Sequence, residues 1–171
     1  GLAPMARAQD VQQVPALTGR VVDRVGLLRA DQAQALDAKL AAFEQSAGPQ
    51  IVLLLVATTQ PEDIASYAQR VADTWKIGRR DIGDGLLVVV ARDDRKLRIE
   101  VAKALEGAVP DLAARQIIDR QIGPAFKRGD YAGGLDAGLE ALMARIAGEH
   151  LPAPAPRGRA AADEGMDWQN L

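Results

Sequence analysis

Acidic residues are the side chains of this sequence whose types and spacing best suit chemistry. They are Asp23, Asp81, Asp84, Glu106 and Asp111. The only histidine is His150, the serines Ser46 and Ser66 lie outside any nucleophile motif, and cysteine is absent. The sequence therefore excludes a histidine-based triad, a zinc cluster of histidines and cysteines, and a thiol nucleophile. Neither a P-loop nor a GxGxxG phosphate-binding motif is present.

A hairpin predicts where two of these carboxylates meet. Residues 86–91 form a valine-rich apolar run, and residues 97–101 alternate apolar and charged side chains, so both segments predict strands. The polar run 92–96 between them predicts a surface turn. Because the strands of a hairpin are antiparallel, we expect Asp84 and Glu106 to lie together at the end of the sheet away from the turn.

Two further carboxylates extend this candidate site. Asp111 follows Glu106 by five residues and opens a helix, and Asp23 follows a short apolar segment. Clustered carboxylates suit hard cations, so the sequence predicts a metal site of Asp84, Glu106, Asp111 and Asp23 for calcium or another divalent cation. The alternative is structural: Asp84 forms a turn before a glycine, Asp111 lies in a first helical turn and Glu106 is solvated.

Composition bounds the protein class. The 171 residues suffice for one domain with tails, and 48% hydrophobic residues suffice for a core, which must be aliphatic because aromatic residues make up only 4%. The net charge is −2 and no basic stripe is present, which argues against nucleic acid as a partner. Arg79 and Arg80 could hold an anion near Asp81, although a solvated loop is the simpler interpretation. Trp75 and Tyr67 lie on an apolar helix face and suit core packing.

Periodicity predicts the order of the elements. A short strand at 20–23 is followed by a helix at 31–47, a buried strand at 51–57 and a helix that starts at Pro61 and ends at Gly78. After the hairpin we expect a helix at 110–121, stopped by Gly123-Pro124, and a helix capped by Asp130. The prediction is an α/β fold: a three-layer α/β/α sandwich whose mixed sheet contains a right-handed βαβ unit followed by a β-hairpin and two C-terminal helices.

Both ends of the chain suggest export. Residues 1–18 contain Ala6-Arg7-Ala8 followed by Gln9, which matches the cleavage region of a secretory signal peptide, so we interpret them as a signal-peptide remnant and leader. An alanine-rich tail is the alternative. Residues 150–171 are rich in proline and alanine and predict a disordered linker, which we expect to lead into a transmembrane helix beyond residue 171. The domain between them spans 19–149.

The order of several short motifs resembles the TPM domain family, named for thylakoid-lumen, photosystem-repair and receptor-modulator members. The matching pieces are Val22-Asp23 with Gly26-Leu27-Leu28, Tyr67-Ala68, Trp75-Lys76-Ile77-Gly78, Asp84-Gly85, Arg98-Ile99-Glu100-Val101, Leu105-Glu106-Gly107, Pro110-Asp111, Gly129-Asp130-Tyr131 and Gly134-Leu135. Two departures stand out. This chain has Gly83-Asp84-Gly85 where the family shows Asp-Asn-Gly, and Ala102-Lys103-Ala104 where the family places glycines.

The resemblance implies an α/β/α sandwich on the periplasmic side of the inner membrane, anchored by a helix outside these residues. Together with the signal-peptide-like start and the absence of a nucleophile motif, the resemblance favours a non-enzymatic accessory or regulatory module whose partner is a membrane protein or membrane-associated complex. Calcium binding and acid phosphatase activity are attributed to members of the family, so a metal-assisted phosphomonoesterase is the alternative function. The sequence is compatible with an enzyme and with a non-enzymatic domain, and it does not specify an oligomeric state.

Overall fold

A mixed four-stranded sheet forms the centre of the computed structural model, which describes residues 10–149, 151 and 154. Its strands are β1 (Val21–Asp23), β2 (Gln50–Val56), β3 (Gly85–Ala91) and β4 (Lys96–Val101). They lie in the order β1-β2-β3-β4. The first three strands are parallel and β4 is antiparallel to β3, as the predicted βαβ unit and hairpin require.

The two central strands are covered on both faces. Side chains of β2 alternate between two apolar clusters: Ile51, Leu53 and Leu55 belong to one, whereas Val52 and Leu54 belong to the other. This two-sided burial explains the unbroken apolar runs of β2 and β3, because neither strand has a face in contact with water.

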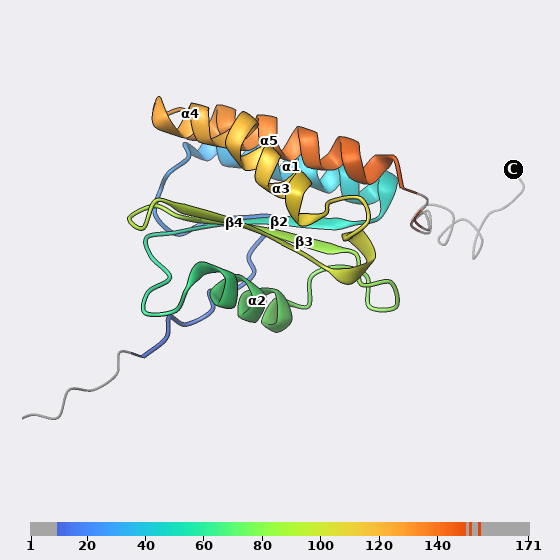
Figure 1. Ribbon diagram of the computed structural model, residues 1–171, viewed down its shortest axis with the longest axis horizontal. Helices are drawn as coiled ribbons and strands as arrows, with labels where there is room; N and C mark the ends of the chain where they lie inside the picture. Colours follow the sequence, from blue (N-terminus) through green and yellow to red (C-terminus); the bar gives the residue numbers. More distant parts are fainter. Residues whose placement is uncertain (1–9, 150, 152–153, 155–171) are drawn as a thin grey trace, which may run out of the picture.

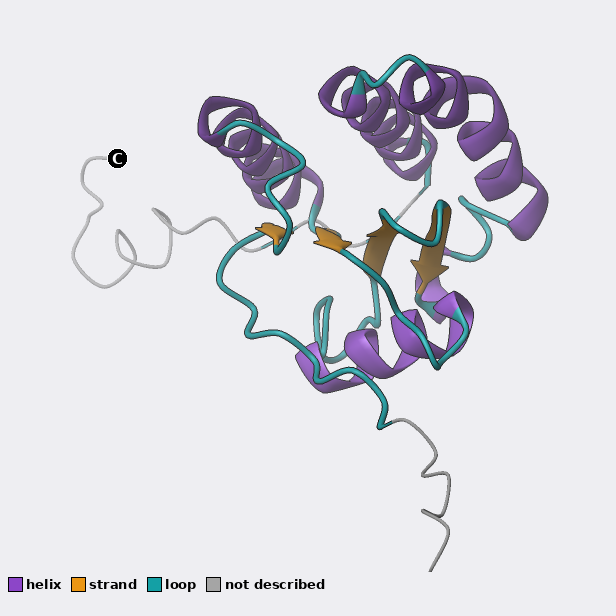
Figure 2. Cartoon of the chain, turned by 90° about the vertical axis from the view of Figure 1, so that its left-hand side faces the viewer, coloured by secondary structure: helices purple, strands orange, loops and turns teal. Residues whose placement is uncertain are grey.

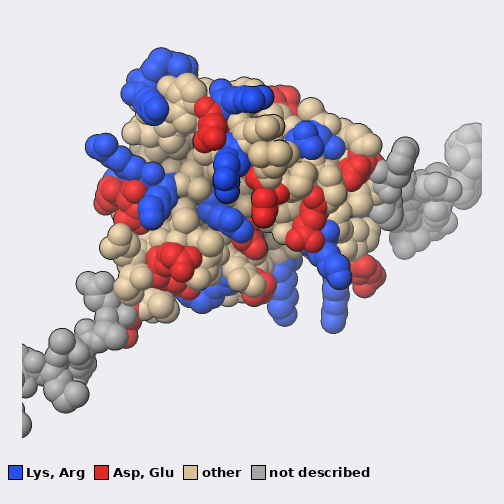
Figure 3. All heavy atoms as spheres, viewed as in Figure 1, with Lys and Arg blue, Asp and Glu red and all other residues tan. Residues whose placement is uncertain are grey.

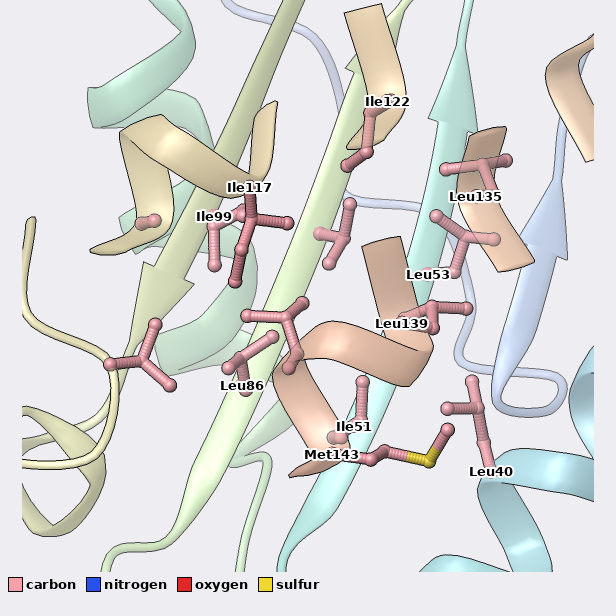
Figure 4. Close-up of a cluster of buried hydrophobic side chains, with 14 of the residues drawn as sticks. Leu40, Ile51, Leu53, Leu86, Ile99, Ile117, Ile122, Leu135, Leu139 and Met143 are labelled. Carbon is pink, nitrogen blue, oxygen red and sulfur yellow. The ribbon is translucent and has the colours of Figure 1, made fainter. Parts of the chain in front are cut away.

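Helices complete the three layers (Figure 1). The helices α1 (Ala30–Ala47), α3 (Asp111–Ile117), α4 (Gly123–Lys127) and α5 (Tyr131–Ala147) cover one face, and α2 (Ile64–Trp75) covers the other. Figure 4 shows the larger cluster, in which Leu135, Leu139 and Met143 of α5 lie over the side chains of Ile51 and Leu53. The core is aliphatic, as the composition predicts.

The two crossover connections have opposite hands. The chain passes from β1 to β2 through α1 on one face and from β2 to β3 through α2 on the other, while the strands advance in one direction across the sheet. Figure 2 shows that the connection through α2 is right-handed, as expected, and that the connection through α1 is therefore left-handed. Left-handed crossovers between parallel strands are rare.

The hairpin prediction is confirmed. Leu86 pairs with Val101 and Ala91 pairs with Lys96, so the turn lies between them at 92–95. Arg95 takes a positive φ of 52° in this turn. The turn is also bonded to the loop after β2, since the amide of Asp93 donates to the carbonyl of Ala57 at 2.8 Å.

Two helix boundaries differ from the sequence prediction. The helix α2 begins at Ile64 rather than Pro61, because the Asp63 carboxylate caps it by accepting from the amide of Ser66 at 2.8 Å. The expected stop at Gly123-Pro124 is wrong, since α3 continues through a π-helical segment (Ile118–Ile122) into α4. The amide of Gly123 donates to the carbonyl of Ile118, and this wider turn precedes Pro124, which has no amide hydrogen to donate.

Residues 10–18 run along α2 as an extended strap. The indole N–H of Trp75 donates to the carbonyl of Pro15 at 2.7 Å, and Arg70 donates to the carbonyl of Gln12 at 2.6 Å. Val14 packs against the apolar cluster below the sheet. The rest of the expected leader, residues 1–9, and nearly all of the expected linker lie outside the described residues. Among the helices that are described, none is both long and apolar enough to cross a membrane.

Candidate functional site at the two ends of the sheet

Asp84 lies at the amino end of the sheet, where β2 and β3 begin, and it is fully buried. One carboxylate oxygen accepts from the backbone N–H of Arg79 at 2.7 Å, and the other accepts from Nε of the same residue at 2.8 Å. Nη2 of Arg79 also lies 2.6 Å from this second oxygen. Asp84 is therefore committed to an internal ion pair that fastens the loop between α2 and β3.

Glycines make room for this loop. A side chain at Gly48 would collide with the guanidinium of Arg79, and one at Gly85 would collide with the backbone of Ile77. The loop is held from β2 as well, because the side-chain oxygen of Gln50 accepts from the amide of Gly78 at 2.8 Å. Gly85 thus permits a close backbone approach, whereas Gly83 takes a positive φ of 72°.

The segment after β4 places Glu106 and Asp111 at the amino end of the sheet as well. The amide of Ala104 donates to the carbonyl of Gly83 at 3.3 Å, which brings the chain that leads to Glu106 beside Asp84. Glu106 follows a short 3-10 turn (Lys103–Leu105), and Asp111 begins α3; both are exposed. The inference that Asp84 and Glu106 share one end of the sheet is thus supported.

Asp23 lies at the opposite end. It ends β1 and is in register with Leu55 and, through it, with Val90, next to the β3–β4 turn. Its carboxylate accepts from three amides of the following loop, those of Val25, Leu27 and Leu28, at 2.9 to 3.2 Å. The length of the parallel strands therefore separates Asp23 from Asp84.

The four predicted ligands do not fit one calcium ion. Asp84 is enclosed by Arg79, Asp23 lies at the other end of the sheet, and only Glu106 and Asp111 are open to solvent. Within residues 10–149, the structure contains no group of three or more acidic or histidine side chains arranged to hold a metal ion. Calcium takes six to eight oxygen ligands, so two exposed carboxylates would supply only a minority of the ligands that it needs.

The carboxyl end of the sheet carries a second polar constellation. Asp94 in the β3–β4 turn accepts from the hydroxyl of Thr58 at 2.8 Å and from the amide of Thr59 at 3.0 Å. Arg92 pairs with Asp93 at 2.8 Å, and this bond raises the pKa of the guanidinium, with smaller contributions from Tyr131 and Asp23. Residues from four separate segments therefore converge on this end.

The connections also favour the carboxyl end. The loop after β1 leaves toward α1 on one face, and the loop after β2 leaves toward α2 on the other, so the two loops diverge between the adjacent strands (Figure 2). In open α/β sheets, ligands bind outside the carboxyl ends of strands at such a switch point. The contact between Thr58 and Asp94 was not predicted from the sequence. Part of it was predictable, because the expected parallel pairing of β2 and β3 places the carboxyl ends of these two strands side by side.

Two shallow surface hollows lie over helices, and none of the four predicted metal ligands lines either of them. One lies on the exposed side of α2 and is lined by Ser66, Gln69, Arg70, Asp73 and Thr74. Another lies between α3 and α5, where Arg145 and Ile117 contribute to its walls.

Comparison with protein families decides the relationship. The model of the TPM domain matches residues 21–145, which is most of the chain and includes the whole sheet and the helices except the last two residues of α5. The chain belongs to the TPM domain family. The expectation drawn from the order of motifs is confirmed, and the three-layer α/β architecture is that of its relatives.

Solved structures of TPM-like domains superpose on this one. The N-terminal domain of a protein from P. gingivalis is 29% identical, has a TM-score of 0.70, and the match covers 77% of this chain and 83% of that one. BA42 from Bizionia argentinensis is 24% identical with a TM-score of 0.62, covering 70% and 81%. The N-terminal domain of cg2496 from Corynebacterium glutamicum is 14% identical with a TM-score of 0.61, covering 90% and 95%. No curated protein matches this chain.

Proposed function

We propose that this TPM domain is an exported, membrane-anchored accessory module that assists or regulates membrane proteins without catalysing a reaction. Family membership and the signal-peptide-like start of the sequence support this proposal. The polar constellation at the carboxyl end, with Arg92 and Asp93 exposed, is the surface at which the partner binds.

The observation that carries the non-enzymatic proposal is the ion pair of Asp84. Its buried carboxylate is engaged by Arg79 through both oxygens, so the acidic residue best placed by the hairpin is structural. Asp23 is engaged in the same way by three amides. A carboxylate whose two oxygens both accept hydrogen bonds from the protein itself is a poor general base or metal ligand.

An in-cell crosslinking experiment tests the accessory role. The native chain is crosslinked in its own cells and purified, and we expect membrane proteins to be enriched above background. Replacing Arg92 and Asp93 by alanine should remove this enrichment. The matched control replaces Arg80 and Asp81, an exposed pair of the same composition at the amino end of the sheet, and should retain it. Equal recovery of membrane proteins by both variants, or none by the native chain, would refute the proposal.

Glu106 and Asp111 are the two predicted ligands that remain able to bind calcium in this proposal. A cation held there has two side-chain carboxylates at most, so we expect weak binding, in the millimolar range of extracellular calcium modules. The melting temperature should rise slightly with millimolar calcium, and the rise should disappear in Glu106→Gln and persist in Asp23→Asn. If the melting temperature still rises with calcium in Glu106→Gln and Asp111→Asn, calcium does not bind at this end of the sheet.

A metal-assisted acid phosphatase is the second candidate. The observation that favours it is the switch point at the carboxyl end, where Arg92 offers a cation for a phosphate and Asp94 lies in the same turn. Hydrolysis of a chromogenic phosphomonoester, measured from about pH 4 to about pH 8 with and without divalent metal, tests it. Turnover that is lost in Arg92→Ala and kept in Arg80→Ala would establish this activity and displace the non-enzymatic proposal.

A further inference from the structure

The strand β4 forms an open edge of the sheet. It pairs with β3 on one side, and in the described residues no strand pairs with its other side. Figures 1 and 2 place β4 at the edge opposite β1. An open edge of six residues is long enough to accept another strand.

The hydrogen-bond pattern shows which groups are available. The amide of Ala102 donates to the carbonyl of Gly85 at 3.0 Å, so even-numbered residues of β4 direct their backbone groups toward β3. By alternation, Leu97, Ile99 and Val101 direct their N–H and C=O groups outward. None of these six groups has a hydrogen-bond partner elsewhere in the described chain.

The two faces of β4 differ in chemistry. The side chains of Leu97, Ile99 and Val101 belong to the apolar cluster beneath α3 and α5, with Ile99 5% exposed and the other two partly exposed. On the opposite face, Arg98 and Glu100 form an ion pair at 3.1 Å and remain 40% and 21% exposed. A strand added at this edge must therefore offer apolar groups on one face and charges on the other.

We propose that the partner is a second copy of this chain, joined by antiparallel pairing of the two β4 strands about a two-fold axis through Ile99. In this register Leu97 lies opposite Val101 of the second copy, and Arg98 lies opposite Glu100 of the second copy. The odd-numbered residues exchange their free backbone hydrogen bonds across the axis. The result is a continuous sheet across both copies, with charge pairs on one face and apolar pairs on the other.

Charge complementarity selects this register. If the axis passes through Arg98 instead of Ile99, Arg98 lies opposite Arg98 of the second copy. If the axis passes through Glu100, Glu100 lies opposite Glu100 of the second copy. Like charges directly opposite each other on neighbouring strands are destabilising, whereas opposite charges stabilise. The order Arg-Ile-Glu is therefore self-complementary in one antiparallel register only. Figure 3 shows that the surrounding face carries charges of both signs, without a field of one sign that would repel a second copy.

Sedimentation of the full chain over a concentration range tests this inference. We expect a monomer–dimer equilibrium at concentrations up to about 1 mM, the range in which small interfaces associate. Each of Arg98→Glu and Glu100→Arg places like charges opposite each other across the interface, and should weaken the dimer about tenfold or more. An equimolar mixture of the two variants should dimerise again, because each glutamate of the first variant then faces an arginine of the second.

Lys96→Glu is the matched control. Lys96 lies on the same strand and face but faces Ala102 of the second copy in this register, so its reversal should leave dimerisation nearly unchanged. A chain that stays monomeric to about 1 mM would overturn the inference. A dimer that is indifferent to both charge reversals, or variants that fail to recover on mixing, would overturn it as well.

Disulfide crosslinking tests the same register with other variants, in case the charge-reversal variants fold poorly. The natural chain has no cysteine, so introduced thiols report a single geometry. Mixed Arg98→Cys and Glu100→Cys chains should form an interchain disulfide rapidly, since directly opposed non-hydrogen-bonded residues have Cβ atoms about 5 Å apart. Lys96→Cys alone should crosslink far more slowly. Equal crosslinking rates for the mixture and for Lys96→Cys would contradict the register, and a monomer that instead takes up an extended peptide at β4 would replace the second copy as occupant.

Discussion

Asp84 shows how a residue that suits chemistry can be used for structure. It lies between two glycines at the open end of a hairpin, a position that suits a ligand site. In the structure, however, it is buried against Arg79 and holds the loop that leads into β3. Asp63 and Asp94 are used similarly, as a helix cap and as a clamp between two turns. Asp23 and Asp130 likewise accept hydrogen bonds from backbone amides close by in the chain.

The Asp84→Asn variant should lose stability without losing a reaction. Removing the charge leaves the guanidinium of Arg79 partly buried without its counter-ion, which we expect to cost about 2 to 4 kcal/mol in the free energy of unfolding. Chemical denaturation measures this loss. Asp81→Asn, at an exposed neighbouring position, should change stability by less than about 0.5 kcal/mol. A loss no greater than that of Asp81→Asn would show that the ion pair is not structural.

Asp63 should make stability depend on acid pH. Hydrogen bonds from the amide and hydroxyl of Ser66 hold the pKa of its carboxyl below the ordinary value of 3.8. Because the folded-state pKa is lowered, the capping contribution is present above the ordinary pKa and is lost as the pH falls through the folded-state value. Asp63→Ala should therefore lower the melting temperature at neutral pH, and this difference should shrink toward about pH 3.

Thermal melts of both proteins across this range measure the effect. Asp73→Ala, an exposed position on the same helix, should show no such pH-dependent difference. A penalty for Asp63→Ala that stays constant down to low pH would assign its effect to something other than the charged cap.

Elements meet closely in this fold where glycines permit it. The segment from α3 through α4 approaches α5 at Gly134 and Gly138, and a Cβ atom at Gly138 would lie 2.6 Å from side-chain atoms of Ile122. The strap of residues 10–18 completes the other face by covering part of α2. The three layers therefore depend on contacts that helix and strand propensities alone do not specify.

Gly138→Ala should destabilise the packing of α5 on the π-helical segment. The added methyl group overlaps Ile122, and overpacking of this kind costs about 1 to 3 kcal/mol. Gly148→Ala is the matched control, since a Cβ there would lie 3.5 Å from its nearest neighbour in ordinary contact. Denaturation curves compare the two. Equal stability of both variants would mean that the helices can separate at this point without cost.

Removal of residues 1–15 should loosen α2. The truncation deletes the carbonyl acceptor of the Trp75 indole and the apolar contact of Val14, a loss of about 2 kcal/mol. In a Trp168→Phe background the fluorescence of Trp75 should shift to the red as its ring gains water. An unchanged emission spectrum would show that the strap does not shield Trp75, and Val14→Ala should give a smaller effect of the same sign.

In the part of the chain that the structure describes, the sheet has one pair of buried central strands and two edge strands, β1 and β4. The strands β2 and β3 are nearly inaccessible to solvent, whereas β4 ends the sheet. The opposite hands of the two crossovers place α1 above the sheet and α2 below it, and they create the divergence of loops at the carboxyl end (Figure 2). Both surfaces proposed for binding, the carboxyl end and the β4 edge, are consequences of this topology.

Amide hydrogen exchange should show how strongly the amides of each strand are protected. Amides of β2 and β3 should exchange slowest, and in dilute solution those of Leu97, Ile99 and Val101 should exchange faster than those of Arg98 and Glu100, which bond to β3. At high concentration the outward amides should become protected as the β4 strands pair. Uniform protection along β4 at every concentration would contradict the alternation on which the edge depends.

Local patterns in the sequence determined much of this protein. The apolar runs of β2 and β3, the polar turn at 92–95 and the helix periodicities fixed the element order, the hairpin and the shared location of Asp84 and Glu106, because these features depend on neighbours along the chain. The family followed from the order of the same segments. The Gly123-Pro124 break did not occur, since packing against α5 stabilises a π-helical turn that propensity alone disfavours.

Only the tertiary structure decided which polar groups are free. The sequence placed Asp23 with Asp84, but parallel register puts them at opposite ends of the sheet. Burial against Arg79 then removed Asp84 from the candidate ligands, and the left-handed crossover at α1 made the carboxyl end a switch point. Pairing register, burial and crossover hand are set by contacts between segments far apart in the chain, and no local pattern contains them.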